Sequence, residues 1–118
     1  PGISCYGDLD EIGPFISQMD VLIVPILEGS GVRIKVFEAL DFGKLVLSTP
    51  VGLEGLAEDL KATIPNTRDP IELAELMIRW YLNPTQRAQT AKLQQAAYWE
   101  NYSPEKLINA LKIMLDAY

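Results

Sequence analysis

A glycine-rich turn, Glu28-Gly29-Ser30-Gly31, is the stretch whose residue types point most directly to chemistry. Two glycines beside a small hydroxyl residue let the chain turn sharply and let a ligand come close to its backbone. A helix is predicted from Val32 to Phe42, and its first turn carries free N–H groups at the positive end of the helix dipole. The glycine turn and the helix start therefore favour an anion such as phosphate.

Two short aliphatic segments hold the glycine turn in place. Residues 21–26 (VLIVPI) precede it, and Leu45-Val46-Leu47 follow the helix. Uninterrupted aliphatic runs are typical of strands that are buried on both faces of a parallel sheet. Gly43 follows the helix and is expected to close it in a left-handed conformation. The order of strand, turn, helix and strand places the glycine turn at the carboxyl edge of the sheet, where ligands of open α/β sheets bind.

The rest of the chain predicts further elements around this unit. Ile3 to Tyr6 has the pattern of a strand, residues 10–19 that of a crossover helix, and residues 62–64 that of a short edge strand. We therefore predict an α/β fold, a Rossmann-like parallel sheet with flanking helices and a helical C-terminal tail. Residues 1–68 would form the sheet unit, and residues 69–118 the C-terminal helices of the same domain.

Three helix starts in the C-terminal part share one chemistry: Asp69-Pro70, Asn83-Pro84 and Ser103-Pro104. Each places a side-chain acceptor at the N-cap and proline at the first helical position, where the missing N–H costs nothing. Asp69 and Glu72 also have the spacing of a capping box. Residues 71–82 are apolar around most of the helix circumference, so this helix is expected to be well covered.

The composition excludes some classes of partner. Ten Lys and Arg residues against sixteen Asp and Glu residues give a net charge of −6, and no basic cluster is present, which argues against nucleic acid and anionic membranes. The single cysteine, Cys5, forms no internal disulfide, so the cytoplasm is the expected compartment. The chain has no histidine to activate it, so Cys5 is expected to be a buried thiol rather than a nucleophile.

The segment between residues 3 and 56 resembles the carboxyl-terminal domain of retaining glycosyltransferases of the GT-B architecture, in the large family 4 of group 1. The resemblance includes a glycine loop, Lys-Val-x-Glu-Ala on a helix, Gly-Lys, a strand that ends in Ser-Thr, and a Gly-x-Glu-Gly turn. The matching positions are Gly7, Asp10, Pro14, Asp20, Pro25, Gly29, Gly31, Lys35, Glu38, Ala39, Gly43, Lys44, Ser48, Thr49, Gly52, Glu54 and Gly55.

The resemblance implies a site for a nucleotide-diphosphate sugar, a UDP-, GDP- or ADP-sugar. Glu38 would accept hydrogen bonds from the ribose hydroxyls, and the backbone N–H groups of Gly29, Ser30, Gly31 and Val32 would face the diphosphate or the sugar. Many family members carry a glutamate where this chain has Ser30. The chain is similar to the subgroup with Arg-x-Lys before the helix glutamate, so Arg33 and Lys35 would bind part of the anion. Neither a metal nor a cofactor is implied.

The resemblance also implies that this chain is one part of a larger enzyme. The strand pattern begins almost at Pro1, so the chain is expected to start inside a structural unit. The amino-terminal acceptor domain and the first strands, with the main phosphate clamp, would lie elsewhere in the same protein. No residue here is expected to be catalytic, and exposed sheet edges would allow self-association. The missing domain would also provide any peripheral contact with the inner membrane face.

Simpler interpretations compete with these roles. Glu38 lies opposite the main apolar arc of its helix and three residues after Lys35, so the two could form a solvated ion pair. The glycines could serve only as a tight turn. For the whole chain, a non-catalytic α/β binding or interaction module is the alternative, with a sugar-nucleotide epimerase of the same architecture in third place. We expect the donor-binding part of a hexosyltransferase that acts on a glycan or a lipid-linked acceptor in polysaccharide biosynthesis.

Overall fold

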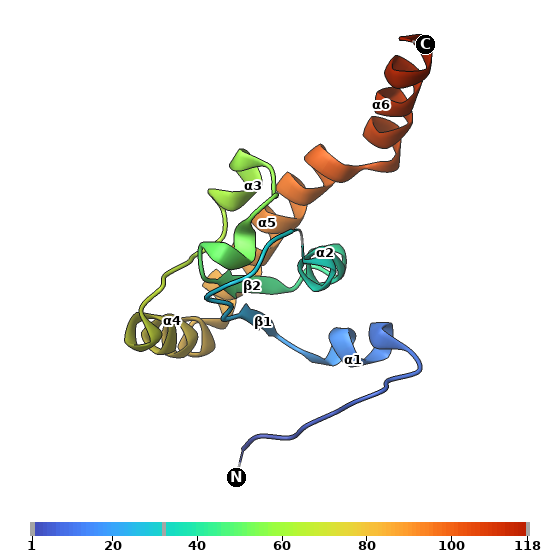
Figure 1. Ribbon diagram of the computed structural model, residues 1–118. Helices are drawn as coiled ribbons and strands as arrows, with labels where there is room; N and C mark the ends of the chain where they lie inside the picture. The colour runs from blue at the N-terminus through green and yellow to red at the C-terminus, as the bar shows by residue number, and fades with distance from the viewer. Residues whose placement is uncertain (1, 32, 118) are drawn as a thin grey trace.

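A two-stranded parallel sheet forms the centre of the molecule (Figure 1). The computed structural model describes residues 2–31 and 33–117. Strand β1 (Val21–Val24) pairs in parallel with β2 (Leu45–Ser48), and helix α2 (Ile34–Asp41) connects them. The predicted order of strand, turn, helix and strand is therefore confirmed, and so is the α/β fold class.

A third extended segment lies along the other edge of β2. The Ser48 N–H donates to the Pro65 carbonyl, and the Thr67 N–H donates to the Ser48 carbonyl, which gives an isolated parallel bridge. The edge strand predicted at residues 62–64 is wrong in position, because these residues belong to the turn that ends α3 (Glu58–Lys61). Extended pairing begins only at Pro65.

Helices cover both faces of the sheet, because successive side chains of a strand point to opposite faces. Val46 and Val24 enter a core formed with α2, the short 3-10 helix η1 (Val51–Leu53) and α3. The opposite face is covered by helices α4 (Pro70–Leu82) and α5 (Pro84–Tyr102). The buried residues on that face are Leu45, Leu47, Leu73, Trp80 and Ala91.

The three predicted C-terminal helices are all present: α4, α5 and α6 (Pro104–Asp116). Two of the three predicted N-caps form, since Asp69 Oδ1 accepts from the Ile71 N–H at 2.8 Å and Ser103 Oγ accepts from the Lys106 N–H at 3.3 Å. Proline at the first helical position has no N–H, so the N–H groups of the residues that follow it, here Ile71 and Lys106, are the ones that need an acceptor.

Two details of these helix starts were predicted wrongly. Asn83 makes no cap bond, because its side-chain amide donates to the Arg79 carbonyl at the end of α4. The capping box at Asp69 does not close either: the Glu72 carboxylate accepts from the Thr67 hydroxyl, and the Asp69 N–H donates to the Thr67 oxygen at 3.1 Å. A neighbouring threonine therefore takes the place of the direct Asp69–Glu72 contact.

The outer edge of β1 has no partner strand among the described residues, which agrees with the exposed sheet edge expected from the resemblance. Residues 3–6 are not a strand, because no described residue pairs with their backbone, and Ile3 is 88% exposed. The expected burial of Cys5 is wrong for the same reason, since its thiol is exposed. Helix α4 is not well covered either, because Ile71, Ile78 and Tyr81 all lie on the surface.

The amino-terminal crossover helix and the last helix extend from this centre. Helix α1 (Ile12–Gln18) lies within the predicted range and buries Ile16. Helix α6 buries no residue and projects away from the sheet, as Figure 1 shows. Within residues 2–31 and 33–117, no helix combines the length and the apolar character needed to cross a membrane.

Candidate functional site

The end of β1 is fixed against β2 just before the glycine turn. Strand β1 stops at Val24, two residues earlier than predicted, because Pro25 has no N–H to donate to the ladder. The Thr49 N–H donates to the Val24 carbonyl at 3.1 Å, and the Thr49 hydroxyl donates to the Ile26 carbonyl. The end of β2 therefore holds the backbone that leads into the glycine turn at the carboxyl edge.

The glycine turn uses backbone conformations that favour glycine. Gly29 has φ 132° and Gly31 has φ 88°, both in the region that side chains rarely adopt. Arg33 closes the turn from the other side, because its Nη1 donates to the Ser30 carbonyl at 2.7 Å and to the Gly31 carbonyl at 2.8 Å. Val32, also predicted to bind the donor, lies outside the described residues.

The start of α2 offers open N–H groups beside the glycine turn. Arg33 occupies the N-cap position, and no side chain caps the helix. The Val36 N–H already donates to the Arg33 carbonyl at 3.0 Å, so the N–H groups of Ile34 and Lys35 are the donors of the first helical turn with no described acceptor. The other end of α2 is closed as predicted: Gly43 has φ 70°, and the Lys44 N–H donates to the Ala39 carbonyl at 2.9 Å.

Two hollows lie along α2, and Lys35 lines both of them. The larger, about 430 Å³, is bounded by residues 22–26 together with Arg33 and Ile34. The smaller, about 120 Å³, lies between α1 and α2 and contains Glu38. The proposed ion pair between Lys35 and Glu38 does not form, since no atoms of these two side chains come within ion-pair distance. Glu38 is half-buried, with its helix neighbour Ala39 fully buried.

The structure therefore brings the predicted site residues together in two groups. Arg33 is hydrogen-bonded to the glycine turn, whereas Glu38 faces the hollow beside α1. The hollow that contains Glu38 includes no glycine of the turn, and Lys35 is the charged residue that lines both hollows along α2.

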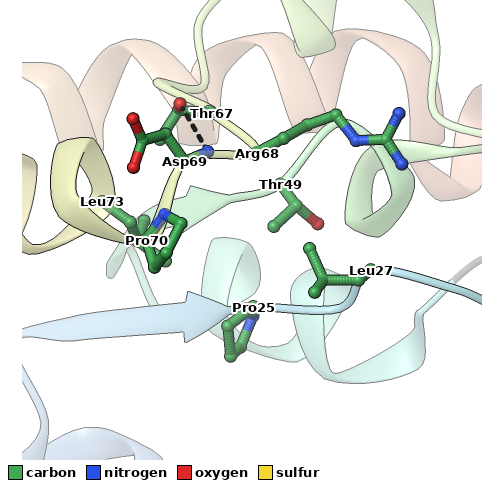
Figure 2. A pocket seen from close by; sticks show the side chains of 8 residues that line it. All are labelled: Pro25, Leu27, Thr49, Thr67, Arg68, Asp69, Pro70 and Leu73. Carbon is green, nitrogen blue, oxygen red and sulfur yellow. Dashed lines mark hydrogen bonds between the residues drawn. The ribbon is translucent and has the colours of Figure 1, made fainter.

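A third hollow, the edge cleft, was missed by the sequence analysis. It encloses about 110 Å³ where β1, β2 and the third extended segment end, as Figure 2 shows. Its lining residues are Pro25, Leu27, Thr49, Thr67, Arg68, Asp69, Pro70 and Leu73. A strand predicted at Pro65 instead of residues 62–64 would have placed Thr67 and Arg68 at this edge.

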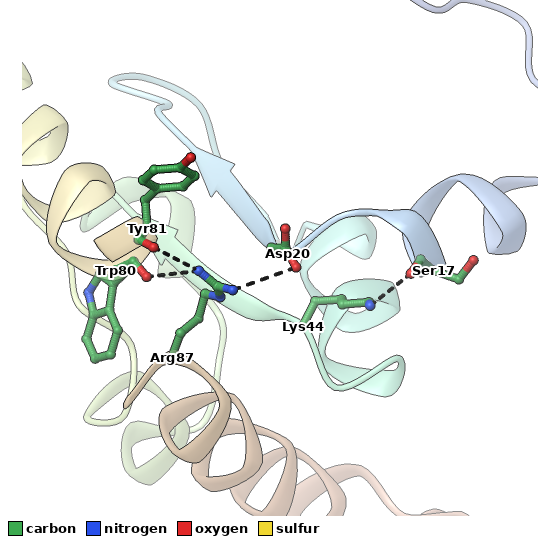
Figure 3. A network of polar contacts seen from close by, with 6 residues as sticks. All are labelled: Ser17, Asp20, Lys44, Trp80, Tyr81 and Arg87. Atoms are coloured by element: carbon green, nitrogen blue, oxygen red, sulfur yellow. Dashed lines mark hydrogen bonds and ion pairs between the residues drawn. The ribbon is translucent and has the colours of Figure 1, made fainter. Parts of the chain in front are cut away.

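A polar network fixes the opposite, amino edge of the sheet (Figure 3). Arg87 Nη1 donates to the Trp80 carbonyl at 3.1 Å and to the Tyr81 carbonyl at 3.4 Å, and Nη2 lies 4.0 Å from Asp20 Oδ1. Lys44 Nζ donates to the Ser17 carbonyl at 3.0 Å, which ties α1 to the start of β2. The network joins helix ends to the amino edge of the sheet.

Metal-binding side chains do not gather in the part of the chain that the structure describes. No group of three or more Cys, Asp or Glu residues lies close enough there to hold a metal ion. The cations available at the carboxyl edge and along α2 are side chains: Arg33, Lys35 and Arg68.

Comparison with known proteins identifies the family. A model of the family described as "Glycosyl transferases group 1" matches residues 1–83, which is more than half of the chain. The chain belongs to this family. As a group 1 glycosyl transferase it carries a domain of enzymes that move a sugar from a donor to an acceptor. The matched range contains the glycine turn, α2 and the edge cleft, and it ends where α4 ends. No curated protein and no solved structure matched the chain.

Proposed function

We propose that this chain is the donor-binding part of a retaining GT-B glycosyltransferase, which transfers a hexose from a nucleotide-diphosphate sugar to a glycan or a lipid-linked acceptor. The observation that carries the proposal is the glycine turn beside the uncapped start of α2, at the carboxyl edge of a parallel sheet and inside the family match. The C-terminal helices from residue 69 would complete the same domain, and a separate domain of the protein would bind the acceptor.

In this proposal the nucleotide lies along α2. The diphosphate is held at the glycine turn by the N–H groups of residues 29–32, with Arg33 and Lys35 as cations, and the ribose hydroxyls donate to Glu38. Lys35 supports this arrangement because it lines both hollows beside α2. No metal or cofactor is part of the proposal.

The proposed contribution to the reaction is electrostatic. When the bond between the sugar and the diphosphate breaks, negative charge grows on the leaving phosphate oxygens. The helix start and the cations stabilise this charge more strongly in the transition state than in the ground state, which is the condition for acceleration. The chain provides this stabilisation without a catalytic nucleophile or base of its own, so alone it would not transfer sugar.

The proposal is tested by calorimetric titration of the protein with UDP, GDP and ADP. We expect one nucleotide to bind, and Glu38→Ala to weaken it by about 1–3 kcal/mol, the cost of losing a hydrogen bond to a charged group. Glu100→Ala, on an exposed position of α5, serves as the matched control. Equal affinity in wild type and Glu38→Ala, or no binding of any nucleotide by a form of the protein that includes the upstream strands, would contradict the proposal.

A second candidate function, a non-catalytic interaction module that self-associates, is favoured by the free edge of β1. No described residue pairs with this edge, and the strand carries no charge to discourage pairing. An apolar hollow of about 330 Å³ flanks it, lined by Val21, Ile23, Met77, Ile78 and Tyr81.

Sedimentation velocity tests the self-association of this edge. We expect a dimer of the wild-type chain that pairs β1 with β1 of a second copy, and we expect Ile23→Lys to shift it to monomer. Ile113→Lys, on the exposed surface of α6, adds the same charge away from the sheet and should leave the dimer intact. A monomeric wild-type chain would remove the support for this function.

A further inference from the structure

One charged side chain of the edge cleft has no hydrogen-bond or ion-pair partner among the described residues. The Thr49 hydroxyl donates to the Ile26 carbonyl and accepts from the Gly52 N–H at 3.2 Å. The Thr67 hydroxyl is bonded to Glu72 and to the Asp69 N–H, and Asp69 Oδ1 accepts from the Ile71 N–H. The guanidinium of Arg68 is the exception, because no described residue forms a hydrogen bond or an ion pair with it.

The direction of the Arg68 side chain separates it from the nearby carboxylates. In Figure 2 the Thr67 and Asp69 side chains lie on one side of the cleft, while Arg68 extends the other way, over Thr49 toward the side of Leu27. Leu27 directly precedes the glycine turn in the chain. The free cation therefore points to the side of the cleft from which the proposed diphosphate loop departs.

The guanidinium of Arg33, unlike that of Arg68, is bonded to the glycine turn. Its Nη1 already donates to two carbonyls of the turn, so only part of its guanidinium can serve a ligand. Arg33 lines the larger hollow along α2, which shares Pro25 with the edge cleft. A diphosphate carries enough charge for more than one cation, and the planar fork of Arg68 can bind two phosphate oxygens at once. Apolar walls, including Leu27 and Leu73, strengthen such a contact by excluding water from one side.

We propose that Arg68 binds a phosphate group of the donor at the carboxyl edge, as a cation in addition to Arg33. This inference rests on the proposed function, and it adds to the binding site a residue that follows the third extended segment. The ligand class is a phosphate or diphosphate ester. Arg68 is exposed and unbonded, so its replacement should leave the fold intact.

The test is a calorimetric titration of the full chain with inorganic pyrophosphate. We expect Arg68→Gln to weaken pyrophosphate binding about tenfold, the effect of one lost charge-assisted hydrogen bond, and Arg68→Lys to recover part of the loss. Arg79→Gln removes the same charge from an exposed position of α4 outside the edge cleft, and it should change the affinity less than twofold. Glu38→Ala should have no effect, because pyrophosphate has no ribose.

The outcomes separate this inference from the proposed function. Equal effects of Arg68→Gln and Arg79→Gln, or no pyrophosphate binding at millimolar concentration, would overturn the role of Arg68. In one outcome, pyrophosphate binding requires Arg68, but nucleotides bind no more tightly than pyrophosphate and their affinity is unchanged by Glu38→Ala. The phosphate contact of Arg68 is then supported and the proposed donor site is contradicted. If nucleotides bind through Glu38 and Arg68→Gln leaves their affinity unchanged, the donor site stands and the contact fails.

Discussion

The two strands of the sheet have similar sequences and very different surroundings. Strand β1 reads VLIV and β2 reads LVLS, yet all four residues of β2 are buried, whereas β1 buries only Val24. The difference lies in the neighbours, because β2 is bonded along both edges and β1 along one. Burial of an aliphatic strand is therefore decided by what the rest of the chain places beside it, not by the strand itself.

A side chain supplies part of the second edge of β2. Gln94 of α5 is fully buried; its Oε1 accepts from the Val46 N–H at 2.9 Å and its Nε2 donates to the Val46 carbonyl at 3.1 Å. The same nitrogen lies 3.2 Å from the Thr63 carbonyl. These bonds take the place of a paired strand at Val46, where the backbone would otherwise be buried without partners. Two residues further on, the third extended segment takes over at Ser48.

The largest effect is expected at Gly52, which lies against the ends of β1 and β2 with no room for a side chain. A Cβ at this position would overlap Ser48 Oγ and lie 3.0 Å from Val24 Cγ1 and 3.2 Å from the Val24 carbonyl. We expect Gly52→Ala to lower the free energy of unfolding by about 3 kcal/mol or more, since the overlap forces strand ends apart. Urea denaturation measures the loss. Gly7→Ala, with no atom within 4 Å, is the control and should change stability little.

A direct test of the comparison truncates the two residues that face each other in the sheet register, Ile23 of β1 and Leu47 of β2. Leu47→Ala should cost about 3 kcal/mol, because a fully buried side chain leaves a cavity. Ile23→Ala should cost about 1 kcal/mol, because that side chain is already partly in water. Equal losses in urea denaturation would show that β1 is covered in solution and would break the comparison.

Sequence patterns predicted the elements better than their surroundings. The glycine turn, the closure of α2 at Gly43 and the proline helix starts were predictable because each depends on residues within one or two turns of each other. The exposure of Cys5, the use of Gln94 and the position of Arg68 depend on segments distant in sequence. Gln94 stands beside Gln95 on a polar helix, and no local pattern marks one of the two as buried. The open edge of β1 was expected from the resemblance, but the partial exposure of its residues was missed, because an aliphatic run indicates that a strand needs burial and not which segment covers it.

The role of Gln94 as a substitute strand partner predicts a cost of about 2 kcal/mol for Gln94→Ala. The variant leaves the N–H and the carbonyl of Val46 buried without a partner, and unmade bonds to buried groups carry the full desolvation cost. Gln89→Ala, on the exposed surface of the same helix, is the matched control and should be close to neutral. A small effect of Gln94→Ala would mean that water or a shifted segment can bond to Val46, and the second edge of β2 would then be less fixed than its geometry indicates.

The smallest expected effect concerns Tyr98 of α5, whose ring packs 5.6 Å from that of Phe37 on the β2 side. Burial raises the pKa of the Tyr98 phenol above its ordinary value of 10.0, and the negative charge of Asp41 raises this pKa further. The folded state then holds the phenolic proton more tightly than the unfolded state, so this stability is complete below about pH 10 and is lost as pH rises through the folded pKa. Urea denaturation as a function of pH should show a steeper alkaline loss for wild type than for Tyr98→Phe, with Tyr81→Phe as the control for removing a hydroxyl from an exposed ring. Identical alkaline profiles for wild type and Tyr98→Phe would mean that water reaches the contact between α2 and α5. The tight packing around β2 would then not extend to these two helices.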